Sequence, residues 1–265
     1  MPWAKIEDSL DMYYDVDDFT DPWKTPETVV LHHGNSKSSR FWYAWVPLLA
    51  RHYRVVRFDA RGFGQTTVPP PGYQWYLSGF ARDLRLLLDH LKLDKVHLVG
   101  ETMGGTISMQ FAYEYPARLL SLTVCSSPFR FTGPYYLEAA EKQEKDGVLA
   151  FARESIGRRL DPSETDPAFV EWYANEMGKT ARHVGVETLR ALAGNDLSDT
   201  LRQIRVPTLI LSAENRPHYS PQELQEMQSL IPGSKLVVFQ GTSGFVQHSA
   251  PEMCVEALLA FLRQL

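Results

Sequence analysis

The residues with the clearest chemical potential lie in a strand–turn–helix segment near the middle of the chain. A buried apolar run, Lys95–Val99, ends at Gly100, and a helical pattern starts within two residues. Gly100 and Gly104 flank Thr102 at positions −2 and +2, where a side chain would clash in so sharp a turn. The pattern therefore predicts a turn that presents the Thr102 hydroxyl beside the start of a helix. Such a hydroxyl becomes a nucleophile only when a base takes its proton.

The surrounding pattern predicts a mostly parallel sheet with helices on both faces, because short β-rich runs alternate with longer helical runs. The expected strands are Val29–His32, Arg54–Phe58, Lys95–Val99, Leu120–Cys125, Pro207–Leu211 and Lys235–Phe239, after an edge hairpin of Ala4–Glu7 and Met12–Val16. The expected core helices are Ser78–Leu91, Thr102–Tyr115 and Pro251–Leu262.

The segment 131–198 interrupts this alternation. It is charged and lacks a convincing strand, and its helical patterns are Tyr136–Lys145, Val148–Arg159, Ala168–Met177 and Val184–Leu192. About seventy residues are too many for one crossover connection. We therefore predict a helical lid at 131–198 within an α/β core formed by 1–130 and 199–265. The alternative is a set of ordinary crossover helices.

Several motifs in chain order resemble the α/β-hydrolase family. The run from Gly100 to Gly104 resembles its nucleophile elbow, G-x-S-x-G. Three other matches are the H-G oxyanion turn at His33-Gly34, the D-x-R-G-x-G loop at 59–64, and the strand before the catalytic acid at 207–214. The loop that normally presents the catalytic histidine matches 241–252. The resemblance covers almost the whole chain and implies an α/β-hydrolase fold.

The sequence departs from the family at all three positions of the catalytic triad. Thr102 stands where the family has serine, Arg216 where it has aspartate, and Gly244 where it has histidine. The alternative acid position holds Ser126 and Ser127. Arg216 carries only hydrogen-bond donors, so it cannot orient a histidine as a carboxylate does. Without an imidazole the Thr102 hydroxyl stays a protonated alcohol, which disfavours a Ser-His-Asp esterase.

Two histidines are candidates for a replacement base. His248 lies four residues after Gly244, about one helical turn on, and a shifted helix start would direct it toward the site. His218 lies in the loop after the predicted acid strand. For both, the alternative is a solvated surface histidine.

The resemblance implies that the oxyanion hole is retained. The backbone N–H groups of Met103 and Asn35 would stabilise negative charge developing on a carbonyl oxygen. The Thr102 hydroxyl would add a third hydrogen bond, unless it serves only as a helix cap. An inward-pointing Arg216 would favour a carboxylate, enolate or phenolate substrate, whereas an outward-pointing one would be solvated or paired with a surface Glu.

Four further residues are expected at the substrate. Trp42 and Tyr136 belong to aromatic clusters suited to lining an apolar pocket, with core packing as the alternative. Gly244 removes the volume of a ring from the pocket. His33 is the fourth, although it also resembles the structural histidine of the H-G turn.

Three functions follow as alternatives. The first is non-hydrolytic chemistry on an anionic or enolisable carbonyl compound, of the lyase, isomerase, decarboxylase or cyclase type, which relatives in the family perform. The second is hydrolysis of an ester, lactone or C–C bond, with Thr102 as nucleophile or as orienter of water. The third is a pseudoenzyme that binds a ligand without turnover.

Composition narrows the partners to a small-molecule substrate. The 265 residues carry a formal net charge of −5 without a dense basic run, which argues against nucleic acid. The longest apolar run, Phe41–Ala50, contains Pro47 and is far short of the roughly 20 residues a membrane span needs. We expect no signal peptide, a cytoplasmic location, no cofactor and no metal. A homodimer remains open.

Overall fold

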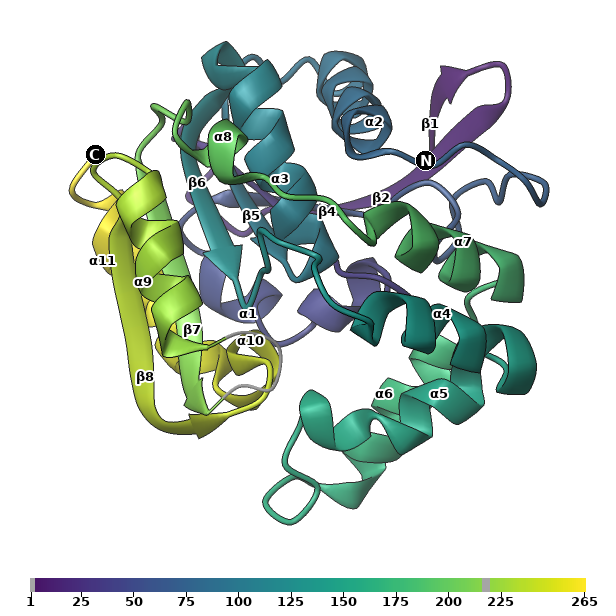
Figure 1. Ribbon diagram of the computed structural model, residues 1–265. Helices are drawn as coiled ribbons and strands as arrows, with labels where there is room; N and C mark the ends of the chain where they lie inside the picture. Colours follow the sequence, from purple (N-terminus) through teal and green to yellow (C-terminus); the bar gives the residue numbers. More distant parts are fainter. Residues whose placement is uncertain (1–2, 216–219) are drawn as a thin grey trace.

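The computed structural model describes residues 3–215 and 220–265, so Arg216 and His218 lie outside the described residues. An eight-stranded sheet forms the centre of the described fold, in the order β1-β2-β4-β3-β5-β6-β7-β8 (Figure 1). The strands are β1 (Trp3–Glu7), β2 (Leu10–Asp17), β3 (Thr28–His32), β4 (Arg54–Phe58), β5 (Val96–Glu101), β6 (Leu119–Cys125), β7 (Thr208–Asn215) and β8 (Lys235–Ser243). β1 pairs antiparallel with β2 and β2 with β4, and the other pairs are parallel.

Helices pack on both faces of this sheet. The core helices are α1 (Val46–Leu49), α2 (Leu77–His90), α3 (Met103–Glu114), α8 (Ser198–Leu201), α9 (Pro221–Leu230), α10 (Val246–Ser249) and α11 (Pro251–Leu262), with short 3-10 turns η1 (Ser39–Trp42) and η2 (Pro116–Arg118). The remaining helices follow β6 and precede α8. They are α4 (Tyr135–Asp146), α5 (Val148–Glu154), η3 (Ile156–Arg158), α6 (Pro167–Gly178) and α7 (Arg182–Leu192).

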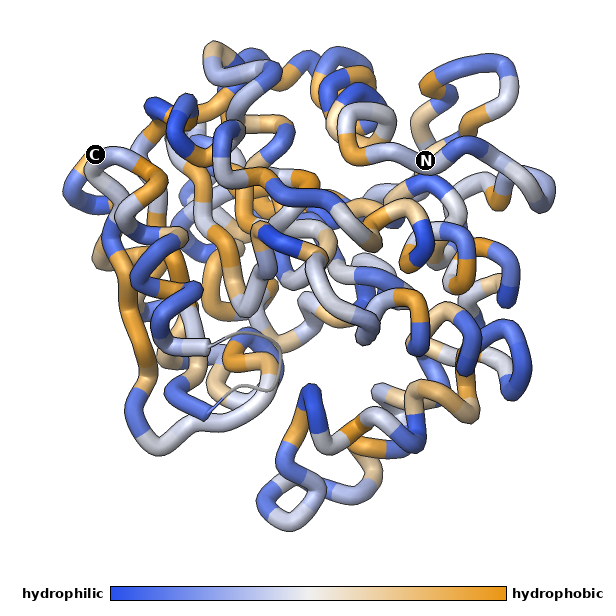
Figure 2. The backbone as a smooth tube through the Cα atoms, in the orientation of Figure 1, coloured by the Kyte–Doolittle hydropathy of each residue, from blue (hydrophilic) through white to orange (hydrophobic). Residues whose placement is uncertain are grey.

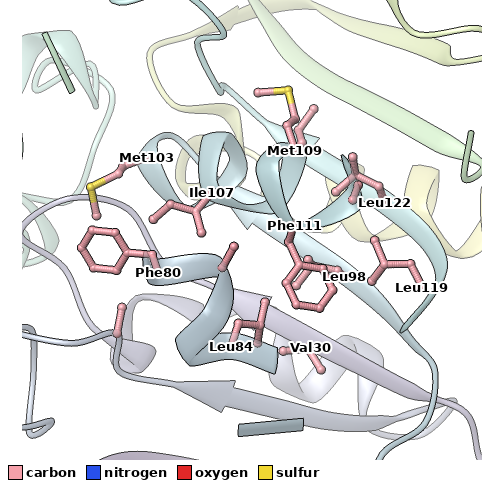
Figure 3. Packing of buried hydrophobic residues seen from close by; sticks show 14 of the residues in the cluster. Val30, Phe80, Leu84, Leu98, Met103, Ile107, Met109, Phe111, Leu119 and Leu122 are labelled. Atoms are coloured by element: carbon pink, nitrogen blue, oxygen red, sulfur yellow. The ribbon is translucent and has the colours of Figure 1, made fainter. Parts of the chain in front are cut away.

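The core lies on both sides of the sheet because alternate strand residues point to opposite faces. Val30 and Leu98 pack with α2, α3 and α9, as Figure 3 shows for the α2–α3 side. Their neighbours Leu31 and Val99 pack with η1, α1 and α11. The central strands β3 and β5 are buried throughout, as expected of parallel strands covered on both faces. In Figure 2 apolar stretches concentrate in the interior and polar stretches over the loops and outer helices.

The structure confirms the predicted α/β-hydrolase fold, and most elements lie within a few residues of their expected bounds. One expected helix, Val148–Arg159, is instead divided into α5 and η3. Ser155 at the break donates its hydroxyl to the Phe151 carbonyl at 2.5 Å. Ser155 and Gly157 are both weak helix formers, which explains the interruption.

The segment 131–198, called here the helical segment, lies between β6 and β7. Its helices pack in pairs, α4 with α7 and α5 with α6, and lie together beside the sheet domain (Figure 1). Within the described residues, none of the helices combines the length and apolar character needed to cross a membrane. The buried residues of the helical segment pack partly in the main core, as Phe131, Val184 and Leu192 do, and partly in two smaller clusters, and some line the cavity described below.

Candidate active site

Thr102 occupies the turn between β5 and α3 in a strained backbone conformation. Its φ is +47° and its ψ is −120°, a region that costs a β-branched residue about 1–3 kcal/mol. The turn is held by the Thr102 N–H, which donates to the Cys125 carbonyl at 3.0 Å. A Cβ added to Gly34 would lie 1.9 Å from Thr102 Oγ1, and one added to Gly104 would lie 2.2 Å from the His33 carbonyl oxygen. Glycine is therefore required where the two loops meet.

Two backbone N–H groups beside Thr102 lack acceptors. Asn35, after the H-G turn, and Met103, at the start of α3, line the same cavity as Thr102. Within the described residues, no oxygen accepts a hydrogen bond from either N–H. Asn35 is fixed by its side-chain amide, which donates to Thr188 Oγ1 on α7 at 2.7 Å. The two N–H groups, which the family resemblance implies as oxyanion donors, are therefore available to a ligand in this cavity.

His33 holds the H-G turn from beneath. Its Nε2 accepts from the Ala60 N–H at 2.9 Å, so its Nδ1–H donates to the Gly34 carbonyl at 2.7 Å. Burial lowers the pKa of His33, which keeps this neutral tautomer. The structure therefore places His33 under the turn rather than at the cavity surface, where a substrate contact was expected.

The neighbouring His32 makes stability depend on pH. His32 is buried, and burial lowers its pKa to about 3. Below about pH 6.5 His32 is therefore protonated in the unfolded chain, whereas in the folded protein it stays neutral down to about pH 3. Because the unfolded state then binds more protons, stability falls on acidification. From pH 7.5 to 5.5 we expect urea unfolding to show a loss of about 1.4 kcal/mol from His32 alone. His32→Gln should remove that share, and equal stability at both pH values would contradict the account.

Gly244 stands where the family carries histidine, and backbone of the helical segment lies directly against it. Its φ is +69°, and an added Cβ would lie 2.4 Å from the Arg159 carbonyl oxygen. The Gly244 N–H donates to the Asn215 carbonyl at 2.9 Å, and the Phe245 N–H donates to that of Arg159 at 2.8 Å. Backbone thus fills the space that a side chain at 244 would need, and an imidazole does not fit there.

His248 lies in a buried polar cluster, called here the Glu101 cluster (Glu101, Lys37, Gln247 and His248). Glu101 Oε1 accepts from the Gly34 N–H at 3.2 Å. Glu101 Oε2 accepts from Lys37 Nζ and Gln247 Nε2, both at 2.6 Å, and lies 2.8 Å from His248 Nε2. His248 Nε2 is also 2.9 Å from Lys37 Nζ. Among the described residues no histidine nitrogen lies within hydrogen-bond distance of the Thr102 hydroxyl.

The charges of this cluster follow from burial and pairing. Burial alone would raise the pKa of Glu101, yet His248 and Lys37 hold it well below its usual range. Burial lowers the pKa of Lys37 to about 8 against the opposing pull of Glu101. Burial also lowers the pKa of His248. At neutral pH the cluster therefore contains a carboxylate, an ammonium and a neutral imidazole.

The cavity beside Thr102 has a volume of about 80 Å³ and lies between the turn and the helical segment. It is lined by Asn35, Lys37, Thr102, Met103, Ser126, Pro128, Phe131, Tyr135, Tyr136, Gln143, Phe151, Arg159, Met177, Leu189, Leu192 and Phe245. Tyr136 lies in this lining, where substrate contact was expected. Trp42 does not, because it is fully buried in the core against Trp45.

Three polar side chains of the cavity are unpaired or only partly paired among the described residues. Arg159 is buried and donates only to the Ser155 carbonyl and hydroxyl, both at 2.7 Å, without a carboxylate partner in the described part of the chain. Gln143 is fully buried, and neither atom of its amide has a hydrogen-bond partner among the described residues. The same holds for Ser126 Oγ, at the end of β6. Buried polar groups are normally hydrogen-bonded, so these side chains have hydrogen-bonding capacity left for a ligand.

Sequence reasoning did not find Lys37 or Arg159 as functional candidates, and it assigned no catalytic role to Glu101. The burial of all three depends on contacts between distant segments, such as that between Lys37 and Glu101, which are 64 positions apart in the sequence. The local signals were limited to two charged residues beside predicted turns: Lys37 follows the H-G turn, and Glu101 directly precedes Thr102.

Comparison with known proteins identifies the class. The sequence matches the alpha/beta hydrolase fold family over residues 27–251, and the chain belongs to this family. It is 30% identical over 235 residues to 2-hydroxy-6-oxo-2,4-heptadienoate hydrolase from Pseudomonas putida strain F1, with 83% of each chain covered.

Solved structures agree with this assignment. The enol-lactonase from Burkholderia xenovorans LB400 superposes with a TM-score of 0.90 at 22% identity, over 99% of this chain and 100% of that one. A thermophilic esterase from Thermogutta terrifontis, with malate bound, gives a TM-score of 0.85 at 28% identity, over 96% and 94% of the two chains. These relatives are named as a hydrolase, a lactonase and an esterase. Their names favour hydrolysis over the other two functions predicted from the sequence.

Proposed function

We propose that the protein hydrolyses a small carbonyl compound that carries a carboxylate, by cleaving an ester, a lactone or a C–C bond next to a carbonyl group. The observation that carries the proposal is that the N–H groups of Asn35 and Met103 line one cavity beside Thr102 and have no acceptor in the described part of the chain. A carbonyl oxygen between these donors gains negative charge as a nucleophile adds to its carbon. Each such donor contributes roughly 10²–10³ in rate.

Water is the proposed nucleophile, and Thr102 orients it. No histidine nitrogen of the described chain is within hydrogen-bond distance of the Thr102 hydroxyl to take its proton. Its β-branched side chain also restricts the hydroxyl and crowds an incoming carbonyl. Under this proposal intact-protein mass spectrometry during turnover shows no acyl adduct on Thr102.

The carboxylate of the substrate is assigned to the far side of the cavity. Arg159 lacks a carboxylate partner there, and the Gln143 amide supplies a donor and an acceptor to an adjoining polar group. The Pseudomonas relative acts, by its name, on a heptadienoate, and the Thermogutta esterase binds malate. Both compounds carry carboxylates, which supports the same substrate class here. The non-hydrolytic alternative would use the same amide donors, but the relatives named above favour hydrolysis.

The test compares two activated esters of equal chain length. Mono(4-nitrophenyl) glutarate ends in a carboxylate and 4-nitrophenyl pentanoate in a methyl group. We expect kcat/KM of the wild-type protein to be at least about tenfold higher for the glutarate ester, because a charge-assisted hydrogen bond contributes about 1.5–3 kcal/mol. Saturable binding of glutarate without hydrolysis of either ester above the buffer rate would contradict the proposal.

Arg159→Met should remove this preference. Loss of the guanidinium is expected to lower kcat/KM for the glutarate ester by about 10–100-fold and to leave the pentanoate ester nearly unaffected. The matched control is Arg153→Met, since Arg153 is exposed and pairs with Glu171. An equal loss on both esters would show that Arg159 supports the fold rather than the carboxylate.

A further inference from the structure

Lys37 is a buried lysine in the wall of the candidate site. The chain has nine lysines, all in the part that the structure describes, and Lys37 is the one classed as buried, with its side chain 2% exposed. It follows the H-G turn and lines the cavity together with Thr102 and Arg159. Its Nζ lies over the rings of Phe245, Tyr173 and Phe41 at 5.0, 5.3 and 5.4 Å.

Lys37 is placed to supply the proton-transfer group that is missing at Gly244, where the family carries its catalytic histidine. Arg159, the other cation in the described lining of the cavity, cannot release a proton under conditions in which proteins are folded. An amine can release one, and burial makes this easier because it disfavours the charged form. The Lys37 ammonium also has a partner for its proton, since His248 Nε2 is 2.9 Å away.

We propose that Lys37 is the proton-transfer residue of this site and that His248, paired with Glu101, is the group with which it exchanges its proton. The inference rests on the proposed hydrolytic function. Glu101 Oε2 lies 2.6 Å from Lys37 Nζ and 2.8 Å from His248 Nε2. One carboxylate therefore balances one positive charge, whichever of the two nitrogens holds the proton. When the proton moves from Lys37 to His248, the positive charge therefore stays beside the Glu101 carboxylate.

The reaction balances as follows. Lys37 first gives a proton to His248, which passes it to solvent, and Lys37 becomes a neutral amine. This amine takes a proton from water as the water oxygen bonds to the carbonyl carbon. The π electron pair of the C=O bond moves onto its oxygen, which the N–H groups of Asn35 and Met103 hold. The oxyanion then collapses, the bond to the leaving oxygen breaks, and that oxygen takes the proton from the Lys37 ammonium. Ester and water yield acid and alcohol, and Lys37 is again the neutral amine.

The first test uses two substitutions that remove proton transfer in different ways. Lys37→Arg keeps a cation beside Glu101 but cannot act as a base, and Lys37→Met removes the charge. For both we expect kcat on mono(4-nitrophenyl) glutarate to fall by about 10²–10⁴, with a small change in KM. Monomethyl glutarate should lose more, because its alkoxide leaving group requires a proton. Lys179→Arg, at an exposed lysine, is the control.

The pH dependence separates proton transfer from a structural role. The charged and titratable groups facing Lys37 are Glu101 on β5, His248 on α10, Arg159 after η3 and the Tyr173 phenol on α6. With the amine as base, kcat/KM of the wild type should rise with pH through a midpoint near 8. This rise should be absent from the residual activity of Lys37→Arg. A folded Lys37→Arg protein with more than half of the wild-type kcat would overturn the inference.

A second measurement needs no variant and no turnover. In protein labelled with ¹³C-lysine, one of nine Cε resonances should titrate near pH 8 while the others titrate at higher pH. All nine titrating above about pH 10 would overturn the role of Lys37 and leave the hydrolase proposal intact. Absence of ester hydrolysis by the wild type would instead overturn the proposed function and the role of Lys37 with it.

Discussion

Replacing Gly34 by alanine should lower kcat/KM for mono(4-nitrophenyl) glutarate by at least about 10³. A methyl group at this position would lie 1.9 Å from Thr102 Oγ1 and 3.4 Å from the Glu101 carbonyl oxygen, so the two loops must move apart. Asn35 follows directly and would carry its N–H away from that of Met103. Loss of one oxyanion donor costs about 10²–10³, and displacement of Thr102 adds to it.

The matched control for this substitution is Gly157→Ala. An alanine Cβ there meets no atom within 4 Å, and the backbone has no positive φ. Stability should be measured in parallel, because the separation of two packed loops also reduces the free energy of unfolding. A folded Gly34→Ala protein that retains more than a tenth of the wild-type kcat/KM would contradict the assigned position of the reacting carbonyl.

Glu101→Gln should have the largest effect on stability. It leaves the Lys37 ammonium buried without a carboxylate, and breaking a buried ion pair by removing one partner costs about 3–5 kcal/mol. The NH2 group of the new amide also faces a donor in either orientation, the N–H of Gly34 in one and the side-chain amide of Gln247 in the other, and both groups now donate to the carboxylate. Urea unfolding at pH 7 measures the loss.

The double variant Lys37→Met/Glu101→Gln is the control for this effect. It removes both charges, so we expect it to unfold with a free energy within about 1–2 kcal/mol of the wild type. The single variant should also recover as pH rises toward 10.5. Since the unfolded chain then holds more protons on Lys37 than the folded protein does, stability increases with pH in that window. Simple additivity of the two substitutions would contradict a coupled pair.

Local pattern was sufficient for the fold and for the turn at Thr102. The alternating apolar and helical patterns predicted the strands and helices, and the glycines on either side of Thr102 predicted the sharp turn there. The capping box of Ser220 and Glu223, at the start of α9, is a further local signal of this kind.

The candidate site was predicted less completely, because its polar groups come together only through tertiary packing. His248 is 211 residues from Lys37 in the sequence, yet their nitrogens are 2.9 Å apart. Arg159 belongs to a run that the sequence predicts as helix, and its approach to the cavity depends on the break at Ser155 and on the contact of its carbonyl with Phe245. The expected roles of Arg216 and His218 remain predictions, since both lie outside the described residues.

A structure with a transition-state analogue tests the central claim most directly. The pentanoic acid that ends in a trifluoromethyl ketone forms a tetrahedral hydrate or adduct and carries the required carboxylate. The account predicts one oxygen of the tetrahedral carbon about 2.7–3.1 Å from the backbone nitrogens of both Asn35 and Met103, with the carboxylate at Arg159. A bound analogue whose tetrahedral oxygens contact neither nitrogen would contradict it.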